Sequence, residues 1–388
     1  MFHGMKKKIV IFLSYIILFF NSNLLSDENN KKLKMGLLAP LTGEYADLGK
    51  SLLYSLQLAL DEINDNDVFI IPRDTGFRNK TKLNLAIEEI RDEGVNIIIG
   101  PLSNEEFVEV KKYNDLIFIS PSNISPEFTN NIISVGVSLE SQLLSLKNFL
   151  KKQNKKKTVI MFPENEYTKF IEQKLDKLGL SDFKIFKYNP DPQVLTGEIE
   201  TLTNYSQRKK NLELRKKIFQ DKEDEQSIKE LDKLEQLYTL GSVNFDSVII
   251  IDFGNNLKSV LTSLVYTDVN QQNVLITSVN QWFDESIFYE NTIKTLYYPS
   301  IDYKEFKKYN KKYFKKFASY PNEITILTYD ALGLIYYAWK KGGKINSTND
   351  FLFKNKIKGK IGTFSFKDRK VTQDLDIYKV ENKKFIKF

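Results

Sequence analysis

The first third of the chain alternates short apolar runs with amphipathic stretches. Between the runs, apolar side chains such as Leu48, Leu52 and Leu56 recur at the spacing of one helix face. Strands that alternate with helices of this length predict a parallel sheet covered on both faces. The expected strands are KMGLLA (34–39), DVFII (67–71), VNIIIG (95–100) and LIFIS (116–120), and the expected helices cover residues 48–63, 83–90 and 104–113.

The same alternation restarts in the second segment and predicts a second α/β unit of similar build. Its expected strands are ISVG (133–136), TVIMF (158–162), FKIFKY (183–188), SVIIID (247–252) and VLIT (274–277). Its expected helices cover residues 139–151 and begin near Tyr167 and Asn255. The chain therefore predicts two α/β lobes of doubly wound parallel sheet.

Three segments have other patterns. Residues 322–340 predict one long apolar helix between Pro321 and Gly342. The C-terminal stretch from KIGTFSF onward alternates apolar and polar positions around turn-like KDRK and ENKK, which predicts a β-hairpin or meander. Residues 206–237 are densely charged and predict two helices divided at 221–224. They form either a solvated hairpin packed lightly on the second unit or a docking surface for a partner.

The N-terminus has the pattern of an export signal. Three lysines, Lys6 to Lys8, precede a twelve-residue apolar run at 9–20, and polar residues follow. This run is short for a bilayer span, so we expect a signal peptide over residues 1–26, cleaved near Ser22 to Ser26. An uncleaved anchor is the alternative, because the small-residue cleavage motif is weak. No other run is long enough to span a membrane.

Composition narrows the possible chemistry. The chain has no cysteine, so it has neither a disulfide nor a lipid-anchoring site, and its single histidine, His3, lies in the expected signal. The exported part would therefore lack Ser-His-Asp and Cys-His catalysis and His or Cys metal sites. Its net charge, +7 minus the three signal lysines, is about +4, with both signs interspersed. We see no basic-aromatic stripe of the kind that binds nucleic acid.

The loop APLTGEYADLGKS at 39–51 superficially resembles a phosphate-binding loop. A Walker loop needs four residues between its glycines, but five separate Gly43 from Gly49, and Glu44 and Asp47 would repel phosphate. The loop nevertheless joins the carboxyl end of a strand to a helix N-terminus, where open α/β sheets bind ligands. Thr42 and Tyr45 are its candidate ligand-facing side chains, although Thr42 can equally shape the helix entry.

The order of several motifs resembles the type I periplasmic binding proteins of the branched-chain amino-acid receptor family. The opening KMGLLAPLTGEYADLGKSLLYSLQLALDEIN is similar to that family's start, and VNIIIGPLSN with LIFISPSNISPEF is similar to its next two ligand-edge loops. ENEYTKF, LTYDALGLIYYAW and KGKIGTFSFKDRK resemble later family segments. The charged insert and VNQWFD look closer to a branch of exported proteins described as penicillin-binding protein activators.

The resemblance implies two lobes joined by three crossing segments, with the ligand in the cleft between them. By position, the crossings would lie near 120–123, 298–301 and 357–362. Lobe 1 would comprise residues 33–121 completed by 302–356. Lobe 2 would comprise 122–299 completed by 361–388, with the charged insert 206–237.

The resemblance also implies the ligand-binding residues. In lobe 1, hydroxyls and backbone N–H groups at Ser103 and Asn104, and at Ser122 and Asn123, would hold a ligand carboxylate. Ile124 departs from the family's usual threonine.

In lobe 2, Tyr167 would cover the ligand, although Thr168 replaces the usual glycine beside it. Asp252 would bind the ligand's ammonium group, with Asp284 as second candidate and a helix cap as the other interpretation of Asp252. Trp282 would line the pocket or serve as a core aromatic.

Taken together, these features predict a non-catalytic monomer in the periplasm that needs no cofactor or metal and binds no nucleic acid. The leading hypothesis is a solute receptor that delivers an amino-acid-like or amide-like ligand to the membrane permease of an ABC importer. The alternative is a regulator of cell-wall synthesis that contacts a synthase through the charged insert. An enzyme that uses paired carboxylates is a distant third, because no acid pair stands out.

Overall fold

A computed structural model describes residues 32–123, 129–269, 272–289, 295–360, 362–367 and 369–388. Its described part divides into two compact units. Unit 1 combines residues up to Ser138 with Lys304–Gln373, and unit 2 combines Leu139–Tyr303 with Asp374–Phe388. The chain therefore passes between the units three times, after residues 138, 303 and 373.

The sheet of unit 1 is parallel throughout, as its apolar runs predict. Its strand order is β2-β1-β3-β4-β5. The strands are β1 (Leu33–Ala39), β2 (Val68–Asp74), β3 (Ile97–Ile99), β4 (Ile117–Ser120) and β5 (Ile132–Ser134). The helices are α2 (Ala46–Ile63), α3 (Lys80–Asp92), α4 (Asn104–Val110), α11 (Tyr303–Phe317) and α12 (Ile326–Gly342), with 3-10 turns η3 (Glu323–Thr325) and η4 (Thr348–Phe351).

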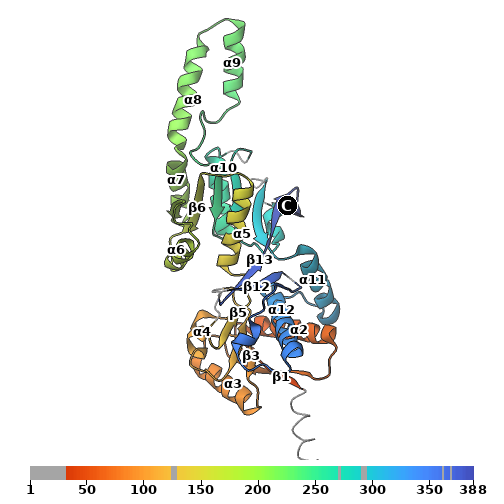
Figure 1. The fold of residues 1–388 in the computed structure, drawn as a ribbon. Coiled ribbons are helices and arrows are strands. Elements are labelled where there is room, and N and C mark those ends of the chain that lie inside the picture. The colour runs from red at the N-terminus through yellow and green to blue at the C-terminus, as the bar shows by residue number, and fades with distance from the viewer. Residues whose placement is uncertain (1–31, 124–128, 270–271, 290–294, 361, 368) are drawn as a thin grey trace, which may run out of the picture. The chain divides into compact units, whose positions relative to one another are not determined.

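Helices cover both faces of this sheet. Met35 and Leu37 of β1 share one apolar cluster with α2 and α12, whereas Leu38 belongs to a second cluster with α3 and α4. Alternate side chains of one strand thus enter opposite cores, and Figure 1 shows the two helix layers. This two-sided burial explains why β1 carries no charged side chain from Met35 to Ala39.

Unit 2 contains a mixed sheet with the order β15-β14-β10-β9-β8-β6-β7, in which β6 to β10 are parallel and β14 and β15 are antiparallel. The strands are β6 (Thr158–Pro163), β7 (Lys184–Tyr188), β8 (Ser247–Ile250), β9 (Leu275–Ser278), β10 (Leu296–Ser300), β14 (Asp376–Glu381) and β15 (Lys384–Lys387). The helices are α5 (Leu139–Lys152), α6 (Thr168–Lys177), α7 (Pro192–Thr203), α8 (Tyr205–Gln220), α9 (Glu225–Glu235), α10 (Gly254–Tyr266) and η2 (Glu285–Tyr289).

Two expected boundaries are corrected by the strand pairing. Residues 132–134 pair as β5 with β4, so the segment up to residue 138 belongs to unit 1 and not to the second lobe. The C-terminal meander is also divided. β12 (Thr363–Lys367) and β13 (Lys370–Asp374) form a small sheet with β11 (Ile357–Lys358), and only β14 and β15 join the large sheet. Periodicity predicts strands here but not their partners.

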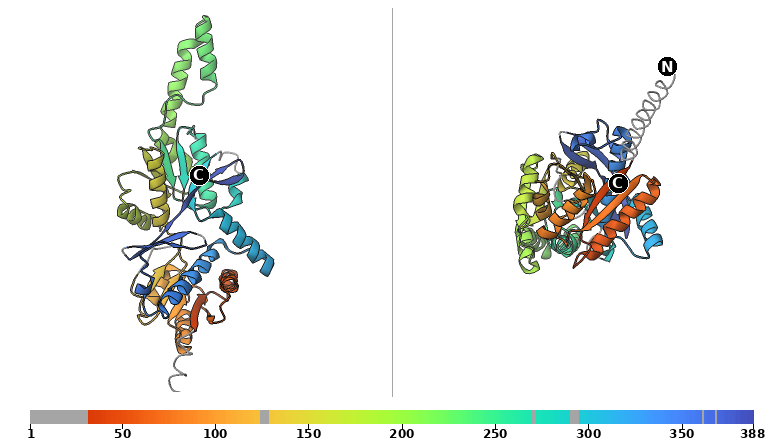
Figure 2. Two further views of the ribbon diagram at one scale, coloured as in Figure 1. Left: turned by 45° about the vertical axis from the view of Figure 1, so that its right-hand side comes forward. Right: turned by 90° about the horizontal axis from the view of Figure 1, so that it is seen from below.

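The charged insert folds as the expected helical hairpin, α8 and α9, which stands away from the sheet of unit 2 in Figures 1 and 2. Its base is fixed by Arg208, whose side chain is 5% exposed. The guanidinium donates hydrogen bonds to the carbonyls of Thr203 (3.0 Å) and Thr267 and to the hydroxyl of Thr239 (3.0 Å). One buried cation therefore ties α8 to the segments on either side of the hairpin.

Among the helices that the structure describes, none combines the length and the apolar character needed to cross a bilayer.

Arg208→Met should loosen the base of the hairpin, because the carbonyls and the hydroxyl that Arg208 contacts would stay buried without a donor. We expect a loss of about 3 kcal/mol in the free energy of unfolding, measured by urea denaturation. We also expect faster tryptic cleavage within residues 205–238. Lys209→Met on the exposed neighbour is the control and should change stability by less than about 0.5 kcal/mol. Equal effects of the two substitutions would contradict this account.

Candidate functional site

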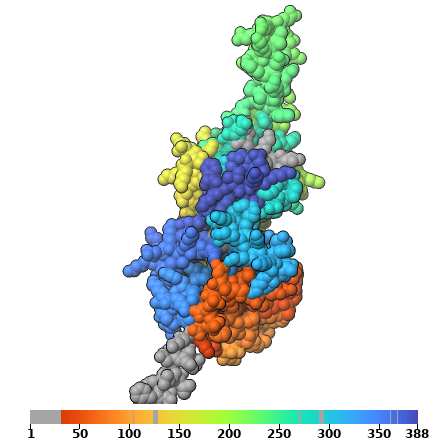
Figure 3. All heavy atoms as spheres, turned by 90° about the vertical axis from the view of Figure 1, so that its right-hand side faces the viewer, coloured from red at the N-terminus to blue at the C-terminus, as the bar shows by residue number. Residues whose placement is uncertain are grey.

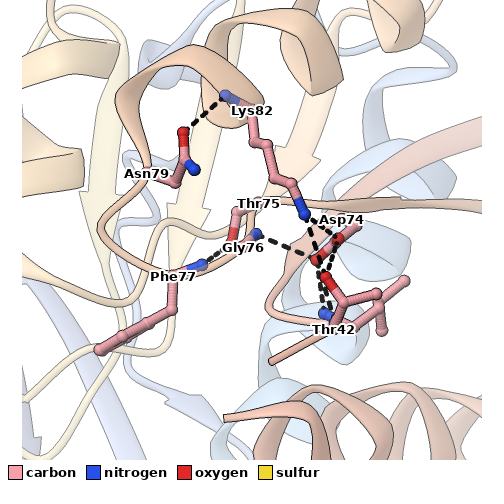
Figure 4. Close-up of polar contacts among 8 residues, drawn as sticks. Thr42, Asp74, Thr75, Gly76, Phe77, Asn79 and Lys82 are labelled. Carbon is pink, nitrogen blue, oxygen red and sulfur yellow. Dashed lines mark hydrogen bonds and ion pairs between the residues drawn. The ribbon is translucent and has the colours of Figure 1, made fainter. Parts of the chain in front are cut away.

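The loop after β1 is held by the carboxylate of Asp74 at the end of the neighbouring strand β2. Oδ1 of Asp74 accepts hydrogen bonds from the amides of Leu41 (2.8 Å), Thr42 (3.2 Å) and Gly76 (3.0 Å). Oδ2 accepts the hydroxyl of Thr42 at 2.5 Å and lies 3.3 Å from Nζ of Lys82, as Figure 4 shows. Burial alone would raise the pKa of Asp74, but these donors outweigh it and lower the pKa to about 2.

Thr42, a predicted ligand-facing residue, therefore has its hydroxyl engaged within the loop. It donates to Asp74 and accepts from Nζ of Lys82 at 3.2 Å. Tyr45 is different. Its ring is 39% exposed and lies 4.2 Å from the ring of Phe77, measured between centroids. The Arg78 guanidinium lies 5.3 Å from the Phe77 ring centre. This part of unit 1 thus exposes the ring of Tyr45 and the guanidinium of Arg78 beside the half-buried ring of Phe77.

Ser103 and Asn104, the next two predicted ligand-binding residues, lie at the N-terminus of helix α4. The hydroxyl of Ser103 accepts the amide of Glu106 at 3.3 Å, and the carboxylate of Glu106 accepts the amide of Ser103 at 3.1 Å. This reciprocal pair is a capping box, and Ser103 is buried within it. Asn104 is the first helical residue, and its side chain lies outside the described part of the structure.

The segment after β4 packs against the end of β5. The side-chain oxygen of Asn123 accepts the amide of Val137 at 2.7 Å, and Ser122 is 2% exposed. A β-carbon at Gly136 would lie only 2.0 Å from the carbonyl oxygen of Ser122, so this close approach requires glycine. Ile124 lies outside the described residues.

In unit 2, Asp252 lies two residues beyond β8 and is 7% exposed. Its Oδ2 accepts the hydroxyl of Tyr188 at 2.6 Å, and its Oδ1 accepts the amide of Phe253 at 2.8 Å. Burial raises the pKa of Asp252, and the hydrogen bonds from Tyr188, the Phe253 amide and Asn256 offset this only in part. Among the described residues, no lysine or arginine pairs with this carboxylate.

The adjacent strand end carries a second buried polar group that the sequence reasoning missed. Asn280 lies two residues beyond β9 and is 1% exposed. Its Oδ1 accepts the hydroxyl of Ser300 (2.8 Å) and the amide of Trp282 (3.0 Å), but its Nδ2 has no hydrogen-bond partner within the described residues. Buried amide donors are nearly always paired, so this one is a candidate ligand contact.

Gln281 links the strand end that carries Asp252 to the strand end that carries Asn280. It donates from Nε2 to the carbonyls of Asp252 and Val279, both at 3.0 Å. β8 and β9 are hydrogen-bonded neighbours, so Asp252 and Asn280 lie at adjacent strand ends.

The remaining predicted residues of unit 2 lie at the same edge of the sheet. Tyr167 precedes α6 and is 58% exposed, while the hydroxyl of Thr168 accepts the amide of Asn165 at 2.9 Å. Trp282 is half-buried in a left-handed backbone conformation, with φ of 51°. Asp284, the second acid candidate, is exposed and accepts the amide and the hydroxyl of Ser286.

Comparison with known proteins agrees with this architecture. Residues 32–179 match the model of the family described as Periplasmic binding protein. A putative branched-chain amino acid ABC transporter protein from Rhodospirillum rubrum is 12% identical, with a TM-score of 0.67 over 92% of this chain and 100% of that one. LivK, a leucine binding protein from Thermotoga maritima, is 15% identical, with a TM-score of 0.56 over 92% and 97%.

The C-domain of LpoA from Haemophilus influenzae, described as a regulator of PBP1A, is similar to the same extent. It is 13% identical, with a TM-score of 0.61 over 92% of this chain and 99% of that domain. This chain spans 59% of the full-length LpoA. No curated protein matches the sequence significantly. The inferred resemblance is confirmed: the chain has the α/β fold of the type I periplasmic binding proteins.

Asp74→Asn tests whether the loop depends on an ionised carboxylate. Because the pKa of Asp74 is lower in the folded chain than in the unfolded chain, the ionised group stabilises the fold above about pH 4, and this stabilisation is lost as the pH falls through about 2. We expect the substitution to cost about 2 kcal/mol at about pH 7 and progressively less in acid. Urea unfolding at several pH values measures this difference.

Glu44→Gln, an exposed acid in the same loop, is the matched control and should change stability by less than about 0.5 kcal/mol. A deficit in Asp74→Asn that does not shrink in acid would show that the carboxylate's charge is not what holds the loop.

Proposed function

We propose that this protein is a non-catalytic periplasmic receptor that binds a small amino-acid-like or amide-like solute for an ABC importer. The observation that carries the proposal is the buried carboxylate of Asp252, which has no cationic partner among the described residues. A buried carboxylate is costly without a counter-charge, and a ligand ammonium group supplies one.

Asn280 adds the complementary chemistry at the neighbouring strand end. Its Nδ2 is a buried donor without a partner in the described residues, suited to a ligand carboxylate or amide oxygen. Tyr188 and Gln281 hold the surrounding groups in place through bonds to Asp252, so a ligand meets donors and acceptors that are already oriented. Two of the similar structures, from Rhodospirillum rubrum and Thermotoga maritima, are described as amino-acid transport or binding proteins, which supports this ligand class.

Asp252→Asn should weaken the binding of amino acids by about a hundredfold, because the substitution removes the charge that faces the ammonium group. Isothermal titration against a panel of amino acids and short amides measures the affinity. In the unsubstituted protein, affinity should fall as the pH drops through the raised pKa of Asp252, because the protonated acid no longer attracts a cation.

Asp182→Asn removes an exposed acid just before β7, at the amino ends of the parallel strands and away from Asp252. This control should leave affinity unchanged. If no amino acid or short amide binds or raises the melting temperature of the unsubstituted protein, the receptor proposal fails.

The second candidate function is regulation of cell-wall synthesis through contact with a synthase. The helical hairpin of α8 and α9 favours it, because Leu214 and Ile218 are each 51% exposed on the side of α8 away from its buried residues Arg208 and Leu212. Exposed apolar side chains among charged ones are typical of surfaces that bind another protein. The similarity to a domain described as a regulator of PBP1A supports the same candidate.

Removal of the hairpin separates the two candidates. The backbone amide of Leu240 bonds the carbonyl of Arg208 at 3.0 Å, so a short Gly-Ser linker can replace residues 209–238 while Arg208 and Thr239 are retained. A regulator should lose its affinity for a purified cell-wall synthase from the same genome, measured by biolayer interferometry. A receptor should keep its solute affinity and show no synthase binding before or after the deletion.

A further inference from the structure

Helix α11 carries a continuous stripe of lysines on one face. Seven of its fifteen residues are lysines, against one acid, Glu305. Helical spacing places five of these lysines opposite the buried side chains Phe306, Tyr309 and Tyr313. All five are exposed: Lys304, Lys307, Lys308, Lys311 and Lys315. We call these five residues the lysine stripe.

The stripe is held outward by firm packing on the opposite side of the helix. The ring of Phe317 stacks on Tyr54 of α2, with centroids 4.1 Å apart. Lys312 pairs with Glu62 at 3.1 Å, and Lys316 pairs with Asp61. Figure 3 shows the blue surface of α11 beside the orange surface that contains α2. α11 therefore presents its lysines from a fixed position.

The surrounding charges leave this surface positive. Within the described residues, ion pairs join lysines of α11 to Asp61, Glu62 and Glu305, and Lys360 also pairs with Glu62. Counting only these residues, the seven lysines of α11 and Lys360 make eight cations against the three acids, a net charge of +5.

A cavity of about 150 Å³ lies beside the stripe. Lys308, Lys312 and Lys360 line it, together with Glu62, Glu305 and Tyr329. Glu305 pairs with Lys308, and Glu62 pairs with Lys312 and Lys360, so carboxylates of the chain already occupy the places between these lysines.

An aromatic pair marks the C-terminal end of the stripe. Phe314 is 45% exposed and Tyr320 is 74% exposed, and their ring centroids lie 4.8 Å apart. Aromatic side chains beside lysines are the combination that settles at the boundary between lipid headgroups and acyl chains.

We propose that the lysine stripe of α11 docks on an anionic phospholipid surface, with the aromatic pair contacting the headgroup layer. Lipid fits this surface better than a protein partner, because lysine is depleted in the centres of protein interfaces. A row of lysines is, by contrast, strongly attracted to anionic lipid. The contact is independent of solute binding and is compatible with either function proposed above.

Vesicle co-sedimentation tests the proposal. The protein recovered from the periplasm after export is mixed with vesicles of phosphatidylglycerol and phosphatidylcholine, or of phosphatidylcholine alone. We expect binding only to the anionic vesicles, weakened by added salt. The triple variant K304Q/K311Q/K315Q should bind at least about tenfold more weakly, and Phe314→Ala should weaken binding by a smaller factor.

The matched control is K209Q/K210Q/K217Q, which removes the same charge from exposed positions of α8. It should bind anionic vesicles as tightly as the unsubstituted protein. Equal loss in both triple variants would overturn the proposal, since the attraction would then be general. Failure to bind anionic vesicles, or equal binding to both lipids, would also overturn the proposal. So would complete displacement from the vesicles by inorganic phosphate at matched ionic strength, since free phosphate would then be enough to occupy the surface. Melting temperatures confirm that each variant is folded.

Discussion

Both large sheets contain a core of parallel strands packed against helices, and the burial of these strands governs where polar chemistry can occur. A strand covered on both faces cannot carry a charged side chain without a desolvation cost. Polar groups must therefore gather where the strands end and the backbone turns toward a helix. In both units the candidate residues follow strand ends: Thr42 after β1, Ser103 after β3, Asp252 after β8 and Trp282 after β9.

The two units meet this constraint in different ways. In unit 1 the candidate loops are fixed by internal hydrogen bonds, since Asp74 accepts three amides, a hydroxyl and a lysine, and Ser103 and Glu106 cap α4 reciprocally. Such groups fix the loops. In unit 2 the buried carboxylate of Asp252 lacks a cation and the buried Nδ2 of Asn280 lacks a partner among the described residues, and the proposed ligand site rests on these two groups. We therefore propose that the main determinants of ligand charge lie in unit 2.

Surface charge is also distributed unevenly. Five outward lysines lie on α11, whereas α8 mixes basic residues with two exposed aliphatic side chains. The two helices suit different partners, a lipid surface in the first case and a protein in the second. The net charge of +7 for the whole chain hides both features, because acids on other elements are interspersed with the basic residues.

The sequence by itself determined most of the elements and the fold class. Strands buried on both faces appear as apolar runs, and helices packed on a sheet appear as amphipathic stretches. Both kinds of element can therefore be recognised in the sequence of one chain. It also located the loops at strand ends, and the Ser103 and Glu106 spacing contains a capping signal that could have assigned Ser103 a structural role. α11 was missed because lysines mask its apolar positions, although Phe306, Tyr309 and Tyr313 carry the helical spacing.

Only the tertiary structure decided which groups meet. Thr42 and Asp74 are 32 residues apart, and Tyr188 and Asp252 are 64 apart, so their pairing depends on strand order. The same holds for β5, which is apolar in either sheet but pairs with β4. Local patterns report how deeply a residue is buried, whereas the order of strands in a sheet is set by contacts between distant segments, and no local pattern encodes that order.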